Sequence, residues 1–179
     1  MPSENFIDPK QIVRSFELEP GDHVADFGAG HGFYTIEMAK KVGGNGKVYA
    51  IDVQKSALDM VRAKAKHENL VNIEPIWADL DNPVHLKIKD NFIEFVLISN
   101  VLHQAEKKQL LLETAFRLLQ KGGRMAVIDW DNTISPLGPP LLLRVKKEVV
   151  KNGAAAAGFV FIKEFEAGSH HYGLLFEKK

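Results

Sequence analysis

The strongest structural signal in the chain is Val24-Ala25-Asp26-Phe27-Gly28-Ala29-Gly30-His31-Gly32-Phe33. It predicts the end of a buried strand, a glycine-rich turn and the start of a helix. Glycine permits a tight turn and lets a ligand approach the backbone closely. The first turn of the following helix would offer unpaired N–H groups and a positive dipole end to an anionic group. A plain strand-to-helix connection would use similar residues, so the turn alone does not establish a binding site.

The glycine spacing narrows the class of ligand. A dinucleotide-binding turn has the pattern G-x-G-x-x-G. Here the third glycine, Gly32, comes one residue early, and Phe33 stands where the pattern requires glycine. This spacing argues against a nicotinamide-dependent oxidoreductase, which remains the weaker enzymatic alternative.

Acidic residues close the predicted strands next to this turn. Asp26 lies two residues before the first glycine, and Asp52 follows Gly32 by 20 residues at the end of the next strand. A carboxylate in that position can accept both ribose hydroxyls of a nucleoside, and Asp79, after the third strand, can accept from an adenine amino group. Each acid alone could be a turn or cap residue. Together, at the carboxyl edge of consecutive strands, they predict a nucleoside site.

The rest of the chain alternates strand-like and helix-like patterns, which favours an α/β fold around a mostly parallel sheet. A hairpin turning at 167–169 ends the chain. The expected strands are 23–27, 47–51, 72–77, 92–98, 124–129 and the two arms of 158–177. The expected helices are 8–16, a segment from the glycine turn to Gly43, 56–68, 105–120 and 141–157, with a Pro/Gly-rich loop at 132–140.

Length, cysteine content and net charge exclude several classes of function. The chain has 179 residues, no cysteine and a formal net charge of zero. We therefore expect a single domain over 1–179, with a short helical segment at 1–20, no thiolate chemistry and no nucleic-acid partner. No apolar run is long enough to span a membrane, and the first residues lack a signal-peptide pattern, which predicts a cytoplasmic protein. The sequence does not indicate an oligomeric state.

At this point the chain resembles a known family. The glycine-rich stretch is similar to the first motif of the class I S-adenosylmethionine-dependent methyltransferases. Four more stretches resemble later motifs of that family: Val48–Asp52, Trp77–Leu80, Ile98–His103 and Lys121–Arg124. The likeness is greatest to the broad group that includes the ubiquinone/menaquinone-biosynthesis methyltransferases. It implies a Rossmann-like three-layer α/β/α sandwich whose seven-stranded sheet has the order 3-2-1-4-5-7-6, with strand 7 antiparallel.

The resemblance also implies S-adenosyl-L-methionine as cofactor and a small-molecule methyl acceptor. The residues it places at the cofactor are Asp26, Gly28, Ala29, Gly30, Gly32, Asp52, Val53, Ala78, Asp79 and Asn100. The segments that cover the substrate in longer family members are short in this chain. A non-catalytic S-adenosylmethionine-binding subunit is therefore a second alternative.

The sequence says less about the residues that would contact the methyl acceptor. His103 follows the fourth strand and is the candidate catalytic residue near the methyl group, or else a helix-start residue bonded to a loop carbonyl. Asp129 and Asp131 either line the pocket or cap the next turn. We also place Asn100, His171 and Tyr172 around the methyl. No ligand spacing predicts a metal site. The basic residues Arg144, Lys146, Lys147 and Lys151 are expected on the solvated face of the last helix, and a phosphate-recognising patch is the alternative.

Overall fold

A seven-stranded sheet runs through the chain in the order β3-β2-β1-β4-β5-β7-β6. The computed structural model describes residues 8–134 and 136–179. The first five strands pair in parallel, and β7 runs antiparallel to both β5 and β6. The strands are β1 (His23–Phe27), β2 (Lys47–Asp52), β3 (Ile73–Trp77), β4 (Ile93–Ser99), β5 (Leu119–Trp130), β6 (Phe159–Glu166) and β7 (His171–Lys178). The expected strand order and direction are confirmed.

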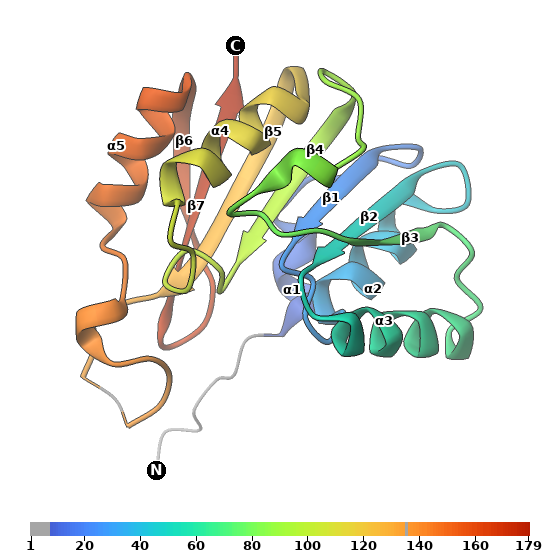
Figure 1. Ribbon diagram of the computed structural model, residues 1–179, viewed down its shortest axis with the longest axis horizontal. Coiled ribbons are helices and arrows are strands. Elements are labelled where there is room, and N and C mark those ends of the chain that lie inside the picture. The colour runs from blue at the N-terminus through green and yellow to red at the C-terminus, as the bar shows by residue number, and fades with distance from the viewer. Residues whose placement is uncertain (1–7, 135) are drawn as a thin grey trace.

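Helices cover both faces of the sheet and make three layers (Figure 1). α4 and α5 pack on one face, and α1, α2 and α3 pack on the other. The α-helices are α1 (Pro9–Arg14), α2 (Phe33–Val42), α3 (Lys55–His67), α4 (Lys108–Leu118) and α5 (Lys147–Ala157), and the short 3-10 turns are η1 (Pro83–His85) and η2 (Leu141–Leu143). The three-layer α/β/α sandwich is as expected.

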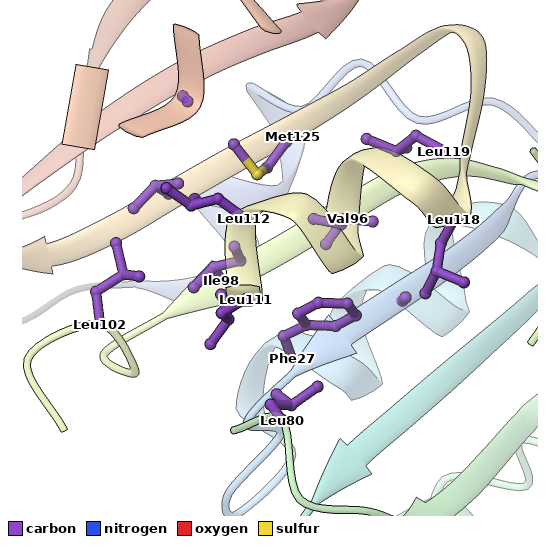
Figure 2. Close-up of a cluster of buried hydrophobic side chains, with 14 of the residues drawn as sticks. Phe27, Leu80, Val96, Ile98, Leu102, Leu111, Leu112, Leu118, Leu119 and Met125 are labelled. Carbon is purple, nitrogen blue, oxygen red and sulfur yellow. The ribbon is translucent and has the colours of Figure 1, made fainter. Parts of the chain in front are cut away.

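Strand alternation explains the two apolar layers, because successive side chains of a strand point to opposite faces. In β4, Val96 and Ile98 face α4, while Phe95 and Leu97 face the layer of α1 and α2. All four are at most 1% exposed, as expected for a central strand buried on both faces. Figure 2 shows the first of these layers, where Phe27 and Ile98 lie against Leu111 and Leu112 of α4.

The last expected helix, 141–157, is shorter than predicted. Residues 141–143 form the turn η2, and α5 begins only at Lys147. Arg144 between them is extended, with φ −70° and ψ 139°. It is 7% exposed and donates to the carbonyls of Pro139, Asp131, Thr133 and Leu137. Arg144 therefore stabilises the loop before α5, and its expected place on a solvated helix face is wrong.

Two other boundaries differ from the sequence prediction. α4 begins at Lys108, because residues 100–105 form turns and Asp81 accepts from the N–H groups of Glu106 and Lys107. It ends at Leu118, and residues 120–123 form a bulge in β5 between the pairs Ile93–Leu119 and Phe95–Arg124. At the N-terminus, Asp8 caps α1 as expected. Residues 1–7 of the expected segment 1–20 lie outside the described part of the chain.

Candidate functional site

A cavity of about 820 Å³ lies at the carboxyl ends of β1, β2 and β4. The glycine turn, the end of β2, the segment after β3 and the turn after β4 form its walls. Nine of the ten predicted cofactor residues line it: Asp26, Gly28, Ala29, Gly30, Asp52, Val53, Ala78, Asp79 and Asn100. Gly32 does not line the cavity and is the N-cap residue of α2. The carboxyl edge of a parallel sheet is where such folds bind ligands.

The glycine turn has a backbone that other residues rarely adopt. Gly28, Gly30 and Gly32 have φ values of 76°, 51° and 76°. A Cβ atom on Gly28 would lie 2.3 Å from Cγ2 of Val101, so this position also needs glycine for space. A Cβ on Gly30 would meet only the carbonyl oxygen of Gly28, at 3.9 Å. Gly30 therefore leaves open space at the cavity wall.

The carboxylate of Asp52 joins the end of β2 to the glycine turn. One oxygen accepts from the backbone N–H of Gly30 at 2.8 Å, and the other accepts from the N–H of Gln54 at 2.8 Å. The residue is 9% exposed and lines the cavity. Each carboxylate oxygen has a further lone pair. Asp52 is thus held by two backbone donors and can still accept from a ligand hydroxyl.

Asp26 is a second carboxyl group beneath the turn. It is 2% exposed and accepts a hydrogen bond from the Thr35 hydroxyl on α2 at 2.5 Å. Burial raises the pKa of Asp26 to about 7, the Thr35 hydrogen bond opposes this shift, and the negative charge of Asp52 adds to it. A positively charged ligand group in the cavity would favour the ionised form.

Asn100 provides a polar group that lacks a partner. It follows β4 in the left-handed region, with φ 57°, and its N–H donates to the carbonyl of Ile128. Its side-chain oxygen is buried and has no hydrogen-bond partner in the described chain. Since buried polar atoms are nearly always satisfied, this oxygen indicates a donor on the ligand.

The segment after β3 forms one wall of the cavity. Ala78 and Asp79 line it, and the Asp79 carboxylate accepts from the N–H of Asp81 at 2.9 Å. Asp81 in turn caps the start of α4. Asp79 is therefore fixed in position by a local turn, and its second oxygen carries no hydrogen bond within the described residues.

The sequence prediction missed several cavity residues. Tyr34 lines the cavity from the first turn of α2, and its burial raises the pKa of its hydroxyl. Gln104 lines it from the turn after β4, with its amide nitrogen donating to the carbonyl of Asn100 at 2.9 Å. Met60 lines it from α3. The proximity of Tyr34 to the glycine turn in the sequence is a signal that could have identified it.

His103 stands beside the cavity rather than in its wall. Its Nδ1 lies 2.8 Å from Oδ1 of Asp129, and its backbone N–H donates to Oδ2 of Asp129 at 3.3 Å. His103 belongs to the turn before α4, so it is not a helix-start residue, and its side-chain partner is a carboxylate rather than a loop carbonyl. The neighbouring residues Val101 and Gln104 do line the cavity.

The other predicted acceptor-side residues are divided between the two faces of the sheet. Asp129 pairs with Tyr172 across β5 and β7, and the Tyr172 hydroxyl donates to the carbonyl of Val145. Trp130 pairs with His171 on the opposite face, with ring centroids 4.2 Å apart. Burial lowers the pKa of His171 to about 4. His171 therefore does not share a face with Asp129.

The described residues also bear on Asp131, on metal binding and on membrane spans. Asp131 accepts from the N–H of Thr133 at 2.9 Å and so caps the turn after β5. Within residues 8–134 and 136–179, no cluster of histidine and carboxylate side chains could hold a metal ion. In the same residues, no helix is long and apolar enough to cross a bilayer.

Comparisons with known proteins agree with this geometry. A family model described as a methyltransferase domain matches residues 18–176. A solved S-adenosylmethionine-dependent methyltransferase from Aquifex aeolicus superposes with a TM-score of 0.88 at 28% identity, covering 100% of this chain and 94% of that one.

Two curated relatives are longer than this chain, and the chain aligns with only part of each. The ubiquinone/menaquinone biosynthesis C-methyltransferase of Francisella tularensis subsp. novicida (strain U112) is 31% identical over 129 residues, which are 72% of this chain and 50% of the relative. The demethylmenaquinone methyltransferase of Lactiplantibacillus plantarum (strain ATCC BAA-793 / NCIMB 8826 / WCFS1) is 27% identical over 132 residues, 74% of this chain and 55% of the relative. The chain thus spans about half the length of these relatives.

Proposed function

This chain belongs to the class I S-adenosylmethionine-dependent methyltransferases, and we propose that it transfers a methyl group from S-adenosylmethionine to a small-molecule acceptor. The observation that carries the proposal is the Asp52 carboxylate, held by the N–H of Gly30 across the glycine turn and open to the cavity. We also propose that residues 1–179 form one methyltransferase domain.

The residues present fit the cofactor. Asp52 would accept the ribose hydroxyls, and Asp79 would accept the adenine amino group beside Ala78. Gly28 and Gly30 leave the backbone of the turn free of side chains, and the unpartnered oxygen of Asn100 would accept from a donor at the methionine end. Ala29, Val53 and Asp26 complete the contact set that we propose, with Gly32 shaping the turn.

Methyl transfer from a sulfonium is an in-line displacement with a good leaving group. The protein therefore contributes mainly by positioning the acceptor and excluding water. A general base is needed only where the acceptor arrives protonated, and we propose His103 for that role. Its place next to the cavity-lining residues Val101 and Gln104 supports this assignment.

We propose that the acceptor is a quinol. The support is that both curated relatives are named for methylation of quinone precursors. A quinol is electron-rich and carries a hydroxyl whose deprotonation activates the ring carbon, which suits a site with an imidazole base. We further propose that the protein acts in the cytoplasm, which is consistent with a sequence without cysteine.

Two other functions make different predictions. A non-catalytic S-adenosylmethionine-binding subunit would bind the cofactor and transfer nothing. A nicotinamide-dependent oxidoreductase would bind NAD, but Phe33 replaces the third glycine of its turn and is 59% exposed at the cavity rim. The spacing therefore disfavours the second of these alternatives.

A thermal-shift panel followed by a transfer assay tests the proposal. S-adenosylmethionine and S-adenosylhomocysteine should raise the melting temperature, because a ligand at 100 times its Kd adds about 2.7 kcal/mol to stability. NAD should leave it unchanged. Methyl-labelled cofactor with 1,4-naphthoquinol, kept reduced, should then give labelled product. A melting-temperature shift with NAD alone would refute the assignment of S-adenosylmethionine as cofactor. Binding of S-adenosylmethionine without any methyl transfer would favour the non-catalytic subunit.

A further inference from the structure

We propose that Asp129 is a positioning residue that fixes the tautomer of His103 and thereby makes Nε2 of His103 the proton acceptor for the methyl acceptor's hydroxyl. This inference rests on the proposed function, because it assigns how the proposed base is prepared. It starts from the contact between the His103 ring and the Asp129 carboxylate, which join the turn after β4 to the end of β5.

The Asp129 carboxylate is 0% exposed, yet no lysine or arginine within the described chain pairs with it. It accepts from Nδ1 of His103 at 2.8 Å, from the His103 backbone N–H at 3.3 Å and from the Trp130 N–H at 2.8 Å. A buried carboxylate is costly unless its oxygens are hydrogen-bonded. His103 supplies two of the three hydrogen bonds, so the carboxylate and the imidazole depend on each other.

The contact determines which nitrogen of His103 carries the proton. An ionised carboxylate only accepts hydrogen bonds, so Nδ1 must be the N–H donor of the neutral ring. Nε2 is then left with its lone pair. Within the described residues no group hydrogen-bonds to Nε2, and this atom is not among the buried unpartnered ones. The ring therefore presents a free acceptor nitrogen.

The turn that carries His103 borders the cofactor cavity. Val101, Gln104 and Ala105 line the cavity, and His103 lies within the same turn with its side chain 11% exposed. The Asp129 carboxylate holds the turn at two points, the ring and the backbone of His103. The inference requires the acceptor to lie over the carboxyl end of β4, at the margin of the cavity next to this ring.

The other nearby titratable groups do not offer the same chemistry. His171 lies on the opposite face of the sheet against Trp130, and burial lowers its pKa to about 4. Tyr172 faces Asp129's side of the sheet, but its hydroxyl donates to the carbonyl of Val145 and burial raises its pKa. Asp131 caps a turn through Thr133. Among these described groups, His103 alone combines a fixed proton on one nitrogen with a free lone pair on the other.

For a quinol acceptor the step balances in atoms and charge. The acceptor hydroxyl gives its proton to Nε2 of His103, and the ring carbon next to the oxygen forms a bond to the methyl carbon as the sulfonium S–CH₃ bond breaks. The sulfur leaves with the bonding pair as a neutral thioether. The ring carbon then loses its proton to water, which restores the aromatic ring. His103 returns its proton to the ring oxygen, so the net products are the methylated quinol, the thioether and one proton, and no oxidant or reductant is consumed.

The first test is the tautomer of His103, measured by ¹⁵N–¹H NMR on the full chain with ¹⁵N-labelled histidine under conditions in which the ring is neutral. In the wild type, Nδ1 of His103 should carry the proton. Asp129→Asn should move the proton to Nε2, because the asparagine amide can donate to Nδ1. A wild-type ring with its proton on Nε2 would overturn the proposal.

The second test is kinetic, with 1,4-naphthoquinol as the probe. Asp129→Asn should lower kcat about 10²- to 10⁴-fold while KM changes less than about 3-fold, which is the range expected for loss of acid–base catalysis. Asp131→Asn is the matched control, because it removes the same charge two residues away and should leave kcat within about 3-fold. Equal kcat for Asp129→Asn and wild type would overturn the proposal.

A third variant distinguishes a His103 that acts as a base from a His103 that only contacts Asp129. His103→Asn keeps a donor that can reach Asp129 but has no basic nitrogen, so it should fold, bind S-adenosylmethionine with wild-type affinity and lose kcat like Asp129→Asn. Full activity in His103→Asn would refute the base even if Asp129→Asn failed to fold. If the wild type binds the cofactor but methylates no quinol, the acceptor class in the proposed function is wrong, and the NMR tautomer then decides the role of Asp129.

Discussion

The Asp26 carboxyl and the Thr35 hydroxyl form a hydrogen bond of 2.5 Å between the end of β1 and the first turn of α2, with both side chains almost fully buried. Burial raises the pKa of Asp26 to about 7, so the cavity contains a carboxyl group that changes charge near neutral pH. The negative charge of Asp52, which lines the same cavity, adds to the rise in the pKa of Asp26, and the charge of Asp26 in turn raises the pKa of Tyr34.

The Asp26 pKa predicts a pH-dependent stability. The folded group has a pKa of about 7 and the unfolded group one of 3.8, so between these values the folded state binds more protons. Stability should fall as pH rises through this window, by a few kcal/mol in total, and the penalty should be complete above about pH 7. Asp26→Asn should remove this slope from urea-unfolding free energies, whereas Asp59→Asn on the exposed face of α3 should retain it.

The affinity for the cofactor should depend on whether the Asp26 carboxyl is protonated. S-adenosylmethionine carries one more positive charge than S-adenosylhomocysteine, and a positive charge in the cavity favours ionised Asp26. The preference for S-adenosylmethionine over S-adenosylhomocysteine should therefore increase about 10-fold between pH 6 and pH 8, measured by titration calorimetry. In Asp26→Asn the preference should be flat with pH. A preference that falls with pH in the wild type would place the sulfonium away from Asp26.

Asp52→Ala should weaken the cofactor about 10- to 1000-fold, since hydrogen bonds to a charged group contribute roughly 1.5–3 kcal/mol each. The substitution also removes the acceptor for the N–H groups of Gly30 and Gln54, so a lower melting temperature should accompany it. Calorimetry with S-adenosylhomocysteine gives the affinity, and Asp59→Ala serves as the control. Unchanged affinity would mean that the ribose binds elsewhere.

Gly28 and Gly30 should respond differently to the same substitution. Gly28→Ala places a Cβ 2.3 Å from Val101 and strains a φ of 76°, so it should destabilise the fold by about 2–4 kcal/mol. Gly30→Ala has space for its Cβ but keeps a φ of 51°, so it should cost only about 1–2 kcal/mol of stability and mainly reduce cofactor affinity. Adding Val101→Ala should recover part of the stability of Gly28→Ala and none of the affinity of Gly30→Ala. Equal unfolding free energies for the two single variants would contradict this distinction.

Much of the fold followed from local patterns. The buried strand β4 is apolar on both faces, and the glycine turn marks the junction of β1 and α2, so their positions could be predicted from adjacent residues. The order of the strands came from the family resemblance. The split of His171 and Tyr172 between two faces was available from strand parity, because neighbouring strand residues point to opposite sides.

Contacts between distant segments could not be predicted in this way. His103 and Asp129 are 26 residues apart, and their contact depends on the register of β4 against β5. The burial of Arg144 depends on four loop carbonyls converging on one guanidinium. Periodicity alone favoured a continuous helix there, and its basic residues suggested a solvated face. No local pattern encodes such convergence.

Arg144 provides the last prediction. Its guanidinium donates to Pro139, Asp131, Thr133 and Leu137, and one lysine ammonium cannot reproduce this planar set of bonds. Arg144→Lys should therefore remove part of this set of hydrogen bonds and loosen the loop between β5 and α5. Hydrogen exchange in that loop should accelerate at least about 10-fold, while affinity for S-adenosylhomocysteine stays unchanged, because none of the loop's described residues lines the cavity. Lys146→Ala, an exposed neighbour, is the control. Unchanged protection in Arg144→Lys would show that the apolar contacts of Val145 and Trp130, rather than Arg144, hold the loop.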